Sequence, residues 1–248
     1  MALGQLGRVE EALRGCDELE QQRRRAGEVG ARFEGVVENM RGWLLRNVGC
    51  LGPADESNER ALAAHREDAR LSAVGFTEAY WAASLDLIDG RLLAGDLAGA
   101  LQRLDATSEL DRWEGTMAWH QRQRLGLLRA RAALTAGDRD TALGLAEAVR
   151  ADAAGRGSRR YELLAAAWVA RAERQPDREA VNRIVDGLEA CARLEGWRLA
   201  AELAAQLGVD QWRVAAERMA SSIVAASGEH RDVASVWFDR LLTPASPM

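Results

Sequence analysis

Residues 135–143 read TAGDRDTAL, and this stretch decides the fold. The glycine–aspartate pair at 137–138 is typical of a boundary between two helices, because glycine ends a helix in the left-handed conformation and aspartate caps the next one. Ala142 and Leu143 follow, a small residue that lets two helices approach and a large one that fills the space between them. The stretch therefore predicts a helical hairpin.

The same arrangement recurs along the chain. Four further stretches carry it: QLGRVEEAL (5–13), CLGPADESN (50–58), LAGDLAGAL (93–101) and RQPDREAV (174–181). Each turn pair is followed at a fixed offset by a small residue: Ala12, Ser57, Ala100, Ala142 and Ala180. Successive turns are about 40 residues apart, a period typical of helical-hairpin repeats. The sequence therefore predicts an array of antiparallel hairpins.

Apolar residues recur at the same distance from each turn, as a shared buried face requires. Seven residues before the turns lie Leu45, Ile88, Ala130 and Trp168. Nine residues after them lie Cys16, Ala61, Leu104, Ala146 and Ile184. Both helices of each hairpin are thus expected to bury one stripe.

Composition agrees with an all-α fold. Ala, Leu, Arg and Glu dominate the 248 residues and only four prolines are present, a bias that favours helix. The net charge of −5 is spread along the chain, which predicts no nucleic-acid partner. All 33 basic residues are arginines, and the lack of lysine excludes P-loop and Schiff-base chemistry.

Metal, cofactor and catalytic residues are not expected. Cys16, Cys50 and Cys191 are widely spaced and predict reduced, mostly buried thiols. The three histidines, His65, His120 and His230, have no metal-ligand spacing. Asp86 and Asp89 in SLDLIDG could suggest acid–base chemistry, but no third group supports it.

Three regions are predicted. Residues 1–195 form the repeat array, whose first repeat is truncated because residues 1–6 read as the last turn of a helix. Residues 196–242 form a degenerate hairpin around Gly208 and a capping helix, and residues 243–248 form a flexible tail. In the capping helix, Val233, Val236, Trp237 and Leu241 are expected to cover the last apolar face.

The truncated first repeat leaves two explanations open. The chain is a piece of a longer protein or begins at an internal start, or a partner replaces the missing helix. The N-terminus has no signal-peptide pattern and no apolar run reaches the roughly 20 residues that cross a bilayer. The sequence therefore predicts a cytoplasmic protein without a membrane partner.

Tryptophans outnumber the other aromatic residues. Trp81, Trp119, Trp168 and Trp197 fall on the first helices of hairpins at positions that share one stripe, which predicts core packing between hairpins. Trp43 lies on nearly the opposite side of its helix and is expected to be exposed.

The motifs LAGDLAGAL and TAGDRDTAL resemble those of tetratricopeptide arrays. In particular, the chain is similar to the C-terminal repeat regions of LuxR-type and MalT-like ATP-dependent transcriptional regulators. This resemblance implies a right-handed superhelical solenoid whose first helices line a concave wall, and a sensor or docking arm as its role. The chain has no Walker motif and no recognisable DNA-reading helix pair, the two modules that flank the arm in such regulators.

The residues opposite the apolar stripe would then face the concave wall. The predicted partner-binding set is Trp43, Arg46, Asp86, Asp89, Arg124 and Arg131. Tryptophan and arginine anchor many interfaces through rigid area and bidentate pairing. The leading hypothesis is a non-enzymatic docking module that binds a protein or peptide. A small-molecule effector sensor is the alternative, an all-α enzyme is a weaker one, and self-association is left open.

Overall fold

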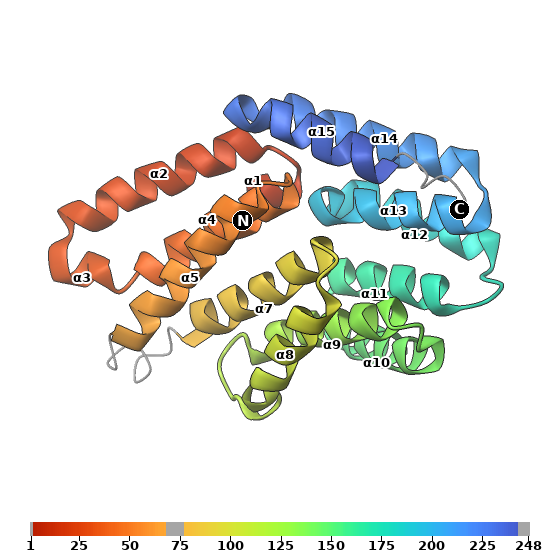
Figure 1. Cartoon of the computed structure of the whole chain (residues 1–248), viewed down its shortest axis with the longest axis horizontal. Coiled ribbons are helices and arrows are strands. Elements are labelled where there is room, and N and C mark those ends of the chain that lie inside the picture. Colours follow the sequence, from red (N-terminus) through yellow and green to blue (C-terminus); the bar gives the residue numbers. More distant parts are fainter. Residues whose placement is uncertain (1, 68–76, 243–248) are drawn as a thin grey trace. The chain divides into compact units, whose positions relative to one another are not determined.

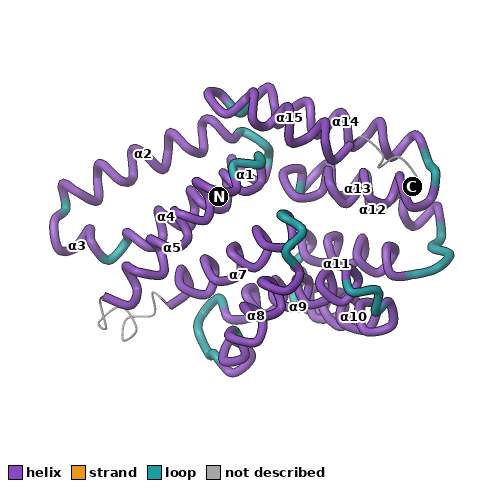
Figure 2. Tube along the Cα trace, viewed as in Figure 1, coloured by secondary structure: helices purple, strands orange, loops and turns teal. Residues whose placement is uncertain are grey.

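The computed structural model describes residues 2–67 and 77–242, and this part of the chain is all-helical (Figure 1). It contains fourteen α-helices and two short 3-10 helices. Figure 2 shows helices and loops and no strand among these residues. The predicted all-α class is confirmed.

The helices form two compact units. Unit 1 contains Met1–Glu10 and Arg129–Met248, and unit 2 contains Glu11–Leu128. The chain therefore leaves unit 1 after its first residues and returns to it more than a hundred residues later. The division predicted at residue 195 falls within helix α13 (Arg193–Leu207) and concerned the repeat pattern, so it stays a prediction. The predicted tail at 243–248 lies outside the described residues.

Two helices cross the boundary between the units. They are α2 (Val9–Arg25) and α9 (Ala118–Thr135). The other elements of unit 2 are α3 (Gly27–Ala31), α4 (Glu34–Asn47), α5 (Leu51–Glu67), α7 (Thr77–Leu93), α8 (Leu97–Ala106) and the 3-10 helix η1 (Ser108–Arg112). Helices α4, α5 and α7 all contact one another, and α8 packs on α7. Part of the core between them consists of Ala61, Leu62, Ala83 and Leu87.

Unit 1 is a series of consecutively packed helices (Figure 1). They are α10 (Arg139–Gly155), α11 (Arg159–Ala172), α12 (Arg178–Cys191), α13, α14 (Asp210–Ala225), the 3-10 helix η2 (Gly228–His230) and α15 (Arg231–Leu242). The short N-terminal helix α1 (Ala2–Gln5) packs on α13. Beside it, the backbone N–H of Glu10 donates to the carbonyl of Ala226 over 2.8 Å. Residues 2–10 thus pack against helices from the other end of the chain.

Most predicted turns form as the sequence indicates. Gly7, Gly95 and Gly137 have φ angles of +79°, +79° and +85°, in the left-handed region that favours glycine. Asp96 caps α8 by accepting from the N–H of Gly99 over 2.9 Å, and Asp138 caps α10 by accepting from Thr141 over 3.1 Å. These residues end one helix and begin the next, as predicted.

The turn predicted at Gly52–Pro53 is wrong. Both residues lie in the first turn of α5, and the left-handed glycine is Gly49, with a φ of +83°. Proline is tolerated in the first turn of a helix, because the N–H it lacks has no intrahelical partner there. The true turn is three residues earlier, so the small residue after it is Ala54, which is 1% exposed, and not Ser57.

This shift changes which residues of the second repeat are equivalent to those of the other repeats, counted from each turn. Arg46 now occupies the position of Leu92 and Leu134, three residues before the turn. Asn58 occupies the position of Cys16, Leu104 and Ala146, nine residues after it, all of them buried. Two polar residues of the second repeat therefore lie at positions where these other repeats carry apolar or small residues.

The tryptophan predictions are mostly confirmed. Trp81, Trp168 and Trp197 are buried, while Trp119 is half-buried. The expected exposure of Trp43 is wrong, because only 3% of this residue is accessible. Its helix, α4, contacts both α5 and α7, so a side chain opposite one interface is buried in another.

Candidate functional site

The six residues predicted to face a concave wall are buried or nearly so. Trp43, Arg46, Asp86 and Arg131 are 3%, 2%, 1% and 8% exposed. The side chains of Asp89 and Arg124 are 17% and 15% exposed. The expectation that these side chains form an exposed wall is therefore wrong. It treated each first helix as packed on one face only, whereas α4 and α7 each contact at least two other helices.

Four of the six residues meet in one group inside unit 2, centred on Asp86. Arg46 from α4 and Arg124 from α9 both donate to Oδ1 of Asp86 in α7. Asn39 of α4 donates from Nδ2 to the other carboxylate oxygen over 2.8 Å. Nε of Arg46 also lies 3.3 Å from Oδ2 of Asp89. We call Asn39, Arg46, Asp86, Asp89 and Arg124 the Asp86 cluster.

A close contact between α4 and α5 extends the Asp86 cluster. Nδ2 of Asn39 lies 3.1 Å from Oδ1 of Asn58, which is 1% exposed. The amide of Asn58 packs directly on Gly42, where an added Cβ would lie 2.6 Å from Nδ2. Gly42 therefore makes room for a polar side chain in a column that is otherwise apolar.

Glu78 and Gln121 lie beside the Asp86 cluster. Gln121 accepts from Nη1 of Arg124 over 3.2 Å and also hydrogen-bonds Glu78. Burial raises the pKa of Glu78 above its usual value, although the Gln121 hydrogen bond and the charge of Arg124 act in the opposite direction. Burial likewise raises the pKa of Asp55 in α5.

The Asp86 cluster is a buried ion-pair network that holds helices together. Asp86 accepts hydrogen bonds from three side chains that come from two other helices. Removing one partner from a buried ion pair costs about 3–5 kcal/mol, because the other charge stays buried without compensation. Four of the predicted binding residues, those in the Asp86 cluster, therefore fix α4, α7 and α9 against one another. Their side chains are too buried to form a docking surface.

An aromatic group in unit 2 joins α5, α7 and the residue after η1. The rings of His65 and Tyr80 are 4.8 Å apart, those of Tyr80 and Trp81 are 5.0 Å apart, and those of Trp81 and Trp113 are 6.4 Å apart. Burial lowers the pKa of His65, so its ring is neutral at pH 7. Within the described residues, Nε1 of Trp81 has no hydrogen-bond partner.

The thiols and acidic side chains of the described residues form no metal site. Cys16 and Cys50 are buried and burial raises the pKa of each thiol, as expected of small core residues. Cys191 is half-buried. Over residues 2–67 and 77–242, no three His, Cys, Asp or Glu side chains lie close enough together to hold a metal ion.

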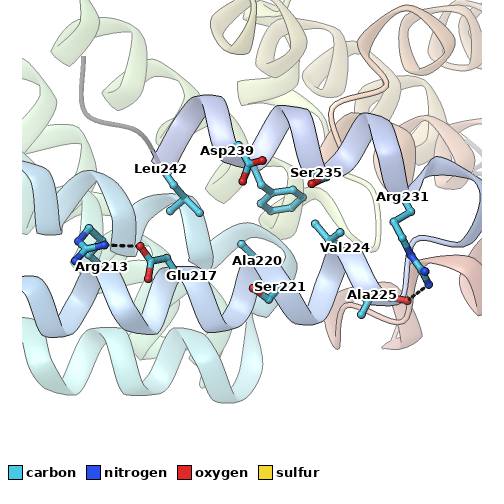
Figure 3. Close-up of a pocket in the computed structure, with 11 residues that line it drawn as sticks. Arg213, Glu217, Ala220, Ser221, Val224, Ala225, Arg231, Ser235, Asp239 and Leu242 are labelled. Atoms are coloured by element: carbon cyan, nitrogen blue, oxygen red, sulfur yellow. Dashed lines mark hydrogen bonds and ion pairs between the residues drawn. The ribbon is translucent and has the colours of Figure 1, made fainter. Parts of the chain in front are cut away.

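Unit 1 carries an open groove between α14 and α15 (Figure 3). Its volume is about 930 Å³, and the two helices that form it run in opposite directions. The floor is apolar and the rims are polar or charged. The lining residues are Arg213, Glu217, Ala220, Ser221, Val224, Ala225, Arg231, Ser235, Phe238, Asp239 and Leu242.

The groove depends on which side of α15 is buried, and this side differs from the predicted one. Ala234 and Phe238 are its buried residues, and the ring of Phe238 lies 4.2 Å from that of Trp197. Val233, Val236 and Leu241, predicted to cover the last apolar face, are 49%, 70% and 37% exposed, and Trp237 is half-buried. The single aromatic ring of Phe238 outweighs the scattered valines, since a buried Phe contributes more apolar area.

Sequence reasoning missed this groove for a definable reason. Small residues at Ser221 and Ala225 mark the exposed side of α14, with Ala220 buried beside them, and Ser235 marks the facing side of α15. The sequence signal for the groove is therefore small residues on two consecutive helices. Their facing arrangement depends on which side of α15 is buried.

The described helices include none with the length and apolar character needed to cross a membrane. Comparison with protein-family models, with curated proteins and with solved structures finds no match to this chain.

Proposed function

We propose that this chain is a non-enzymatic docking module of tetratricopeptide-like helical hairpins, and that it binds a segment of a partner protein in the α14–α15 groove. One observation carries the proposal: two consecutive helices leave between them an open groove of about 930 Å³ with an apolar floor and charged rims. Interfaces combine an apolar centre with a polar rim in the same way. The right-handed superhelical course of the repeats is part of this proposal.

The burial of the predicted binding residues supports this location. The arginines that sequence reasoning placed on a recognition wall are held in the Asp86 cluster or buried. The groove, by contrast, presents Arg213, Arg231 and Asp239 on exposed positions. Recognition is therefore assigned to the C-terminal helices of unit 1.

Two adjacent positions on α15 give a matched test. Ser235 lines the groove, whereas Val236 is 70% exposed and is not among the lining residues. A photo-crosslinking amino acid at position 235, in an extract of the source cells, should attach to a partner that mass spectrometry identifies. The purified partner should then bind the full chain directly. Ser235→Arg should weaken that binding about tenfold or more, because it fills the groove.

Val236→Arg is the control for an added charge on the same helix. It should change the affinity less than about twofold. Both variants must keep the wild-type circular dichroism spectrum and melting temperature. A partner that binds wild type and Ser235→Arg equally well would place recognition elsewhere and contradict the proposal.

The resemblance to bacterial regulators extends the proposal to a regulatory arm. Its test is the neighbouring coding sequence, in which an ATPase segment or a helix–turn–helix segment is expected. Unrelated genes on both sides would remove this extension and leave the docking proposal intact.

A further inference from the structure

The helices of unit 1 follow one packing rule near the C-terminus. Helix α13 contacts α11 and α12, α14 contacts α12 and α13, and α15 contacts α13 and α14. Each helix thus packs against the two helices that precede it. The α14–α15 groove is the position that this rule assigns to one more helix, and its surface continues the interface that α14 and α15 already form.

The walls of the groove suit a helix. Ala220, Ser221 and Ala225 on α14 and Ser235 on α15 are small, so a helix backbone can approach both walls closely. Val224 and Leu242, both half-buried, supply larger apolar surface between these walls. The side-chain ridges of an added helix can then pack between the ridges of α14 and of α15.

Charge is distributed unevenly along the groove (Figure 3). Toward the Leu242 end lie Glu217 and Asp239 with one arginine, Arg213, which pairs with Glu217 over 2.6 Å. The opposite end carries Arg231. Within the described residues, Nη2 of Arg231 donates to the carbonyl of Ala225 over 3.1 Å, and a guanidinium has five N–H groups in all.

A helix has a partial positive charge at its N-terminus and a partial negative charge at its C-terminus. An occupant whose N-terminus lies over Glu217 and Asp239 and whose C-terminus lies beside Arg231 matches both ends of the groove. Arg231 can then donate to the last carbonyls of that helix, which have no intrahelical partner. This direction is antiparallel to α15, which runs from Arg231 to Leu242.

We infer that the occupant of the α14–α15 groove is an amphipathic α-helix of a partner protein, bound antiparallel to α15. The inference rests on the proposed function and specifies the chemistry of the partner. The helix carries an apolar stripe at i, i+3, i+4 and i+7 for the floor, as in other helix-in-groove complexes. Its contact length is about that of α15, which has 12 residues.

A displayed peptide library tests this chemistry directly, whatever the identity of the partner. The probe is a library of 12-residue sequences, matched to the length of α15, selected on the full chain. The library covers helix-forming, extended and proline-rich sequences. We expect selected peptides to share the helical apolar stripe and to become helical when bound, as measured by circular dichroism. Ser235→Arg should weaken their binding about tenfold or more and Val236→Arg less than about twofold.

The direction of the helix is tested with a spin label. Val214 adjoins Arg213 at one end of the groove, and Glu229 in η2 is two residues from Arg231 at the other. A nitroxide on Val214→Cys should broaden the amide signals of the N-terminal residues of the bound peptide, and one on Glu229→Cys those of its C-terminal residues. Cys191→Ser removes the half-buried thiol from the labelling reaction, and Cys16 and Cys50 are buried.

The outcomes separate the two proposals. Peptides that bind in the groove but stay extended, or that show the opposite broadening pattern, overturn the helix inference and leave the proposed function standing. The inference is also overturned if the selected peptides bind wild type and Ser235→Arg with equal affinity, or if the library yields no binder. If the native partner also binds wild type and Ser235→Arg with equal affinity, the proposed function is overturned as well.

Discussion

At the scale of single residues, Asp86 connects three helices. Its carboxylate accepts from Asn39, Arg46 and Arg124 while the residue is 1% exposed. A buried charge is tolerated only when it is paired and hydrogen-bonded. The two arginines therefore depend on Asp86 as much as Asp86 depends on them.

We expect Asp86→Ala to lower the free energy of unfolding by about 3–5 kcal/mol, because it leaves Arg46 and Arg124 without their shared partner. Urea denaturation of the full chain, followed by circular dichroism, measures this loss. Asp232→Ala, an exposed position on α15, is the control and should change stability by less than about 0.5 kcal/mol. Equal stability of Asp86→Ala and wild type would show that the Asp86 cluster does not brace the helices.

Gly42 and Gly144 make a second comparison between residues. Both lie inside helices, but an added Cβ meets Asn58 at 2.6 Å on Gly42 and nothing within 4 Å on Gly144. Gly144→Ala should raise the free energy of unfolding by about 0.5–1 kcal/mol through helix propensity. Gly42→Ala should lower it by about 1 kcal/mol, since overpacking costs about 1–3 kcal/mol and outweighs the same gain.

The double variant Gly42→Ala, Asn58→Ala separates overlap from other effects. Shortening Asn58 removes the atoms that the new methyl group meets, so the cost of Gly42→Ala should largely disappear in this background. A cost that persists at full size would mean that the contact with Asn58 is not its cause.

At the scale of helices, α2 carries an ion-paired turn that responds to acid. Hydrogen bonding from Arg23, and less strongly from Arg24, lowers the pKa of Glu20 to about 2 from its usual 4.5. A carboxyl group whose pKa is lower in the folded chain stabilises the fold above its unfolded pKa, and this contribution is lost as the pH falls toward 2. Its size is modest because the pair lies near the surface.

We therefore expect Glu20→Gln to flatten the fall in melting temperature between pH 4.5 and about pH 2. Arg23→Leu should flatten it in the same way, because it removes the stronger partner. Melting curves at several pH values in low salt measure the effect. Variants whose acid response matches wild type in slope and size would mean that this ion pair contributes nothing to folding.

Helix boundaries also show how far the sequence alone could lead. Glycine turns and aspartate caps depend on neighbouring residues, so Gly95–Asp96 and Gly137–Asp138 were predictable. Gly52–Pro53 misled because proline is accepted both in a turn and in the first turn of a helix. That error of three residues moved Arg46 from a buried column to an exposed one, and it hid the buried position of Asn58.

The candidate groove was less accessible to prediction than the helices. Its walls depend on α15 burying Phe238 and not Val236, a choice made by the contact with Trp197 in another helix. Local periodicity is compatible with either face. Only tertiary packing decides between them, and so the groove emerges only from the structure.

At the scale of the whole molecule, the two units predict separate responses to substitution. All residues of the Asp86 cluster belong to unit 2. Asp86→Ala should therefore raise hydrogen-exchange rates in α7, which carries Asp86, and in α4, which carries Asn39 and Arg46, because local opening follows local stability. Exchange in α13 and α14 should change less than about twofold.

Mass spectrometry of peptic fragments resolves the two regions in one experiment. Phe238→Ala, which removes the ring packed on Trp197 in unit 1, should produce the reverse pattern. A uniform rise in exchange along the chain with either variant would show that the units open together.

The path of the chain also bears on the order of events during protein synthesis. Residues 11–128 are complete while the rest is still being made, so unit 2 can fold as soon as it leaves the ribosome. Residues 2–10 are translated before unit 2, yet Gly7 and Glu10 pack beside Ile223 and Ala226, which are translated after it. Residues 2–10 can therefore form these contacts only after α14 has been synthesised.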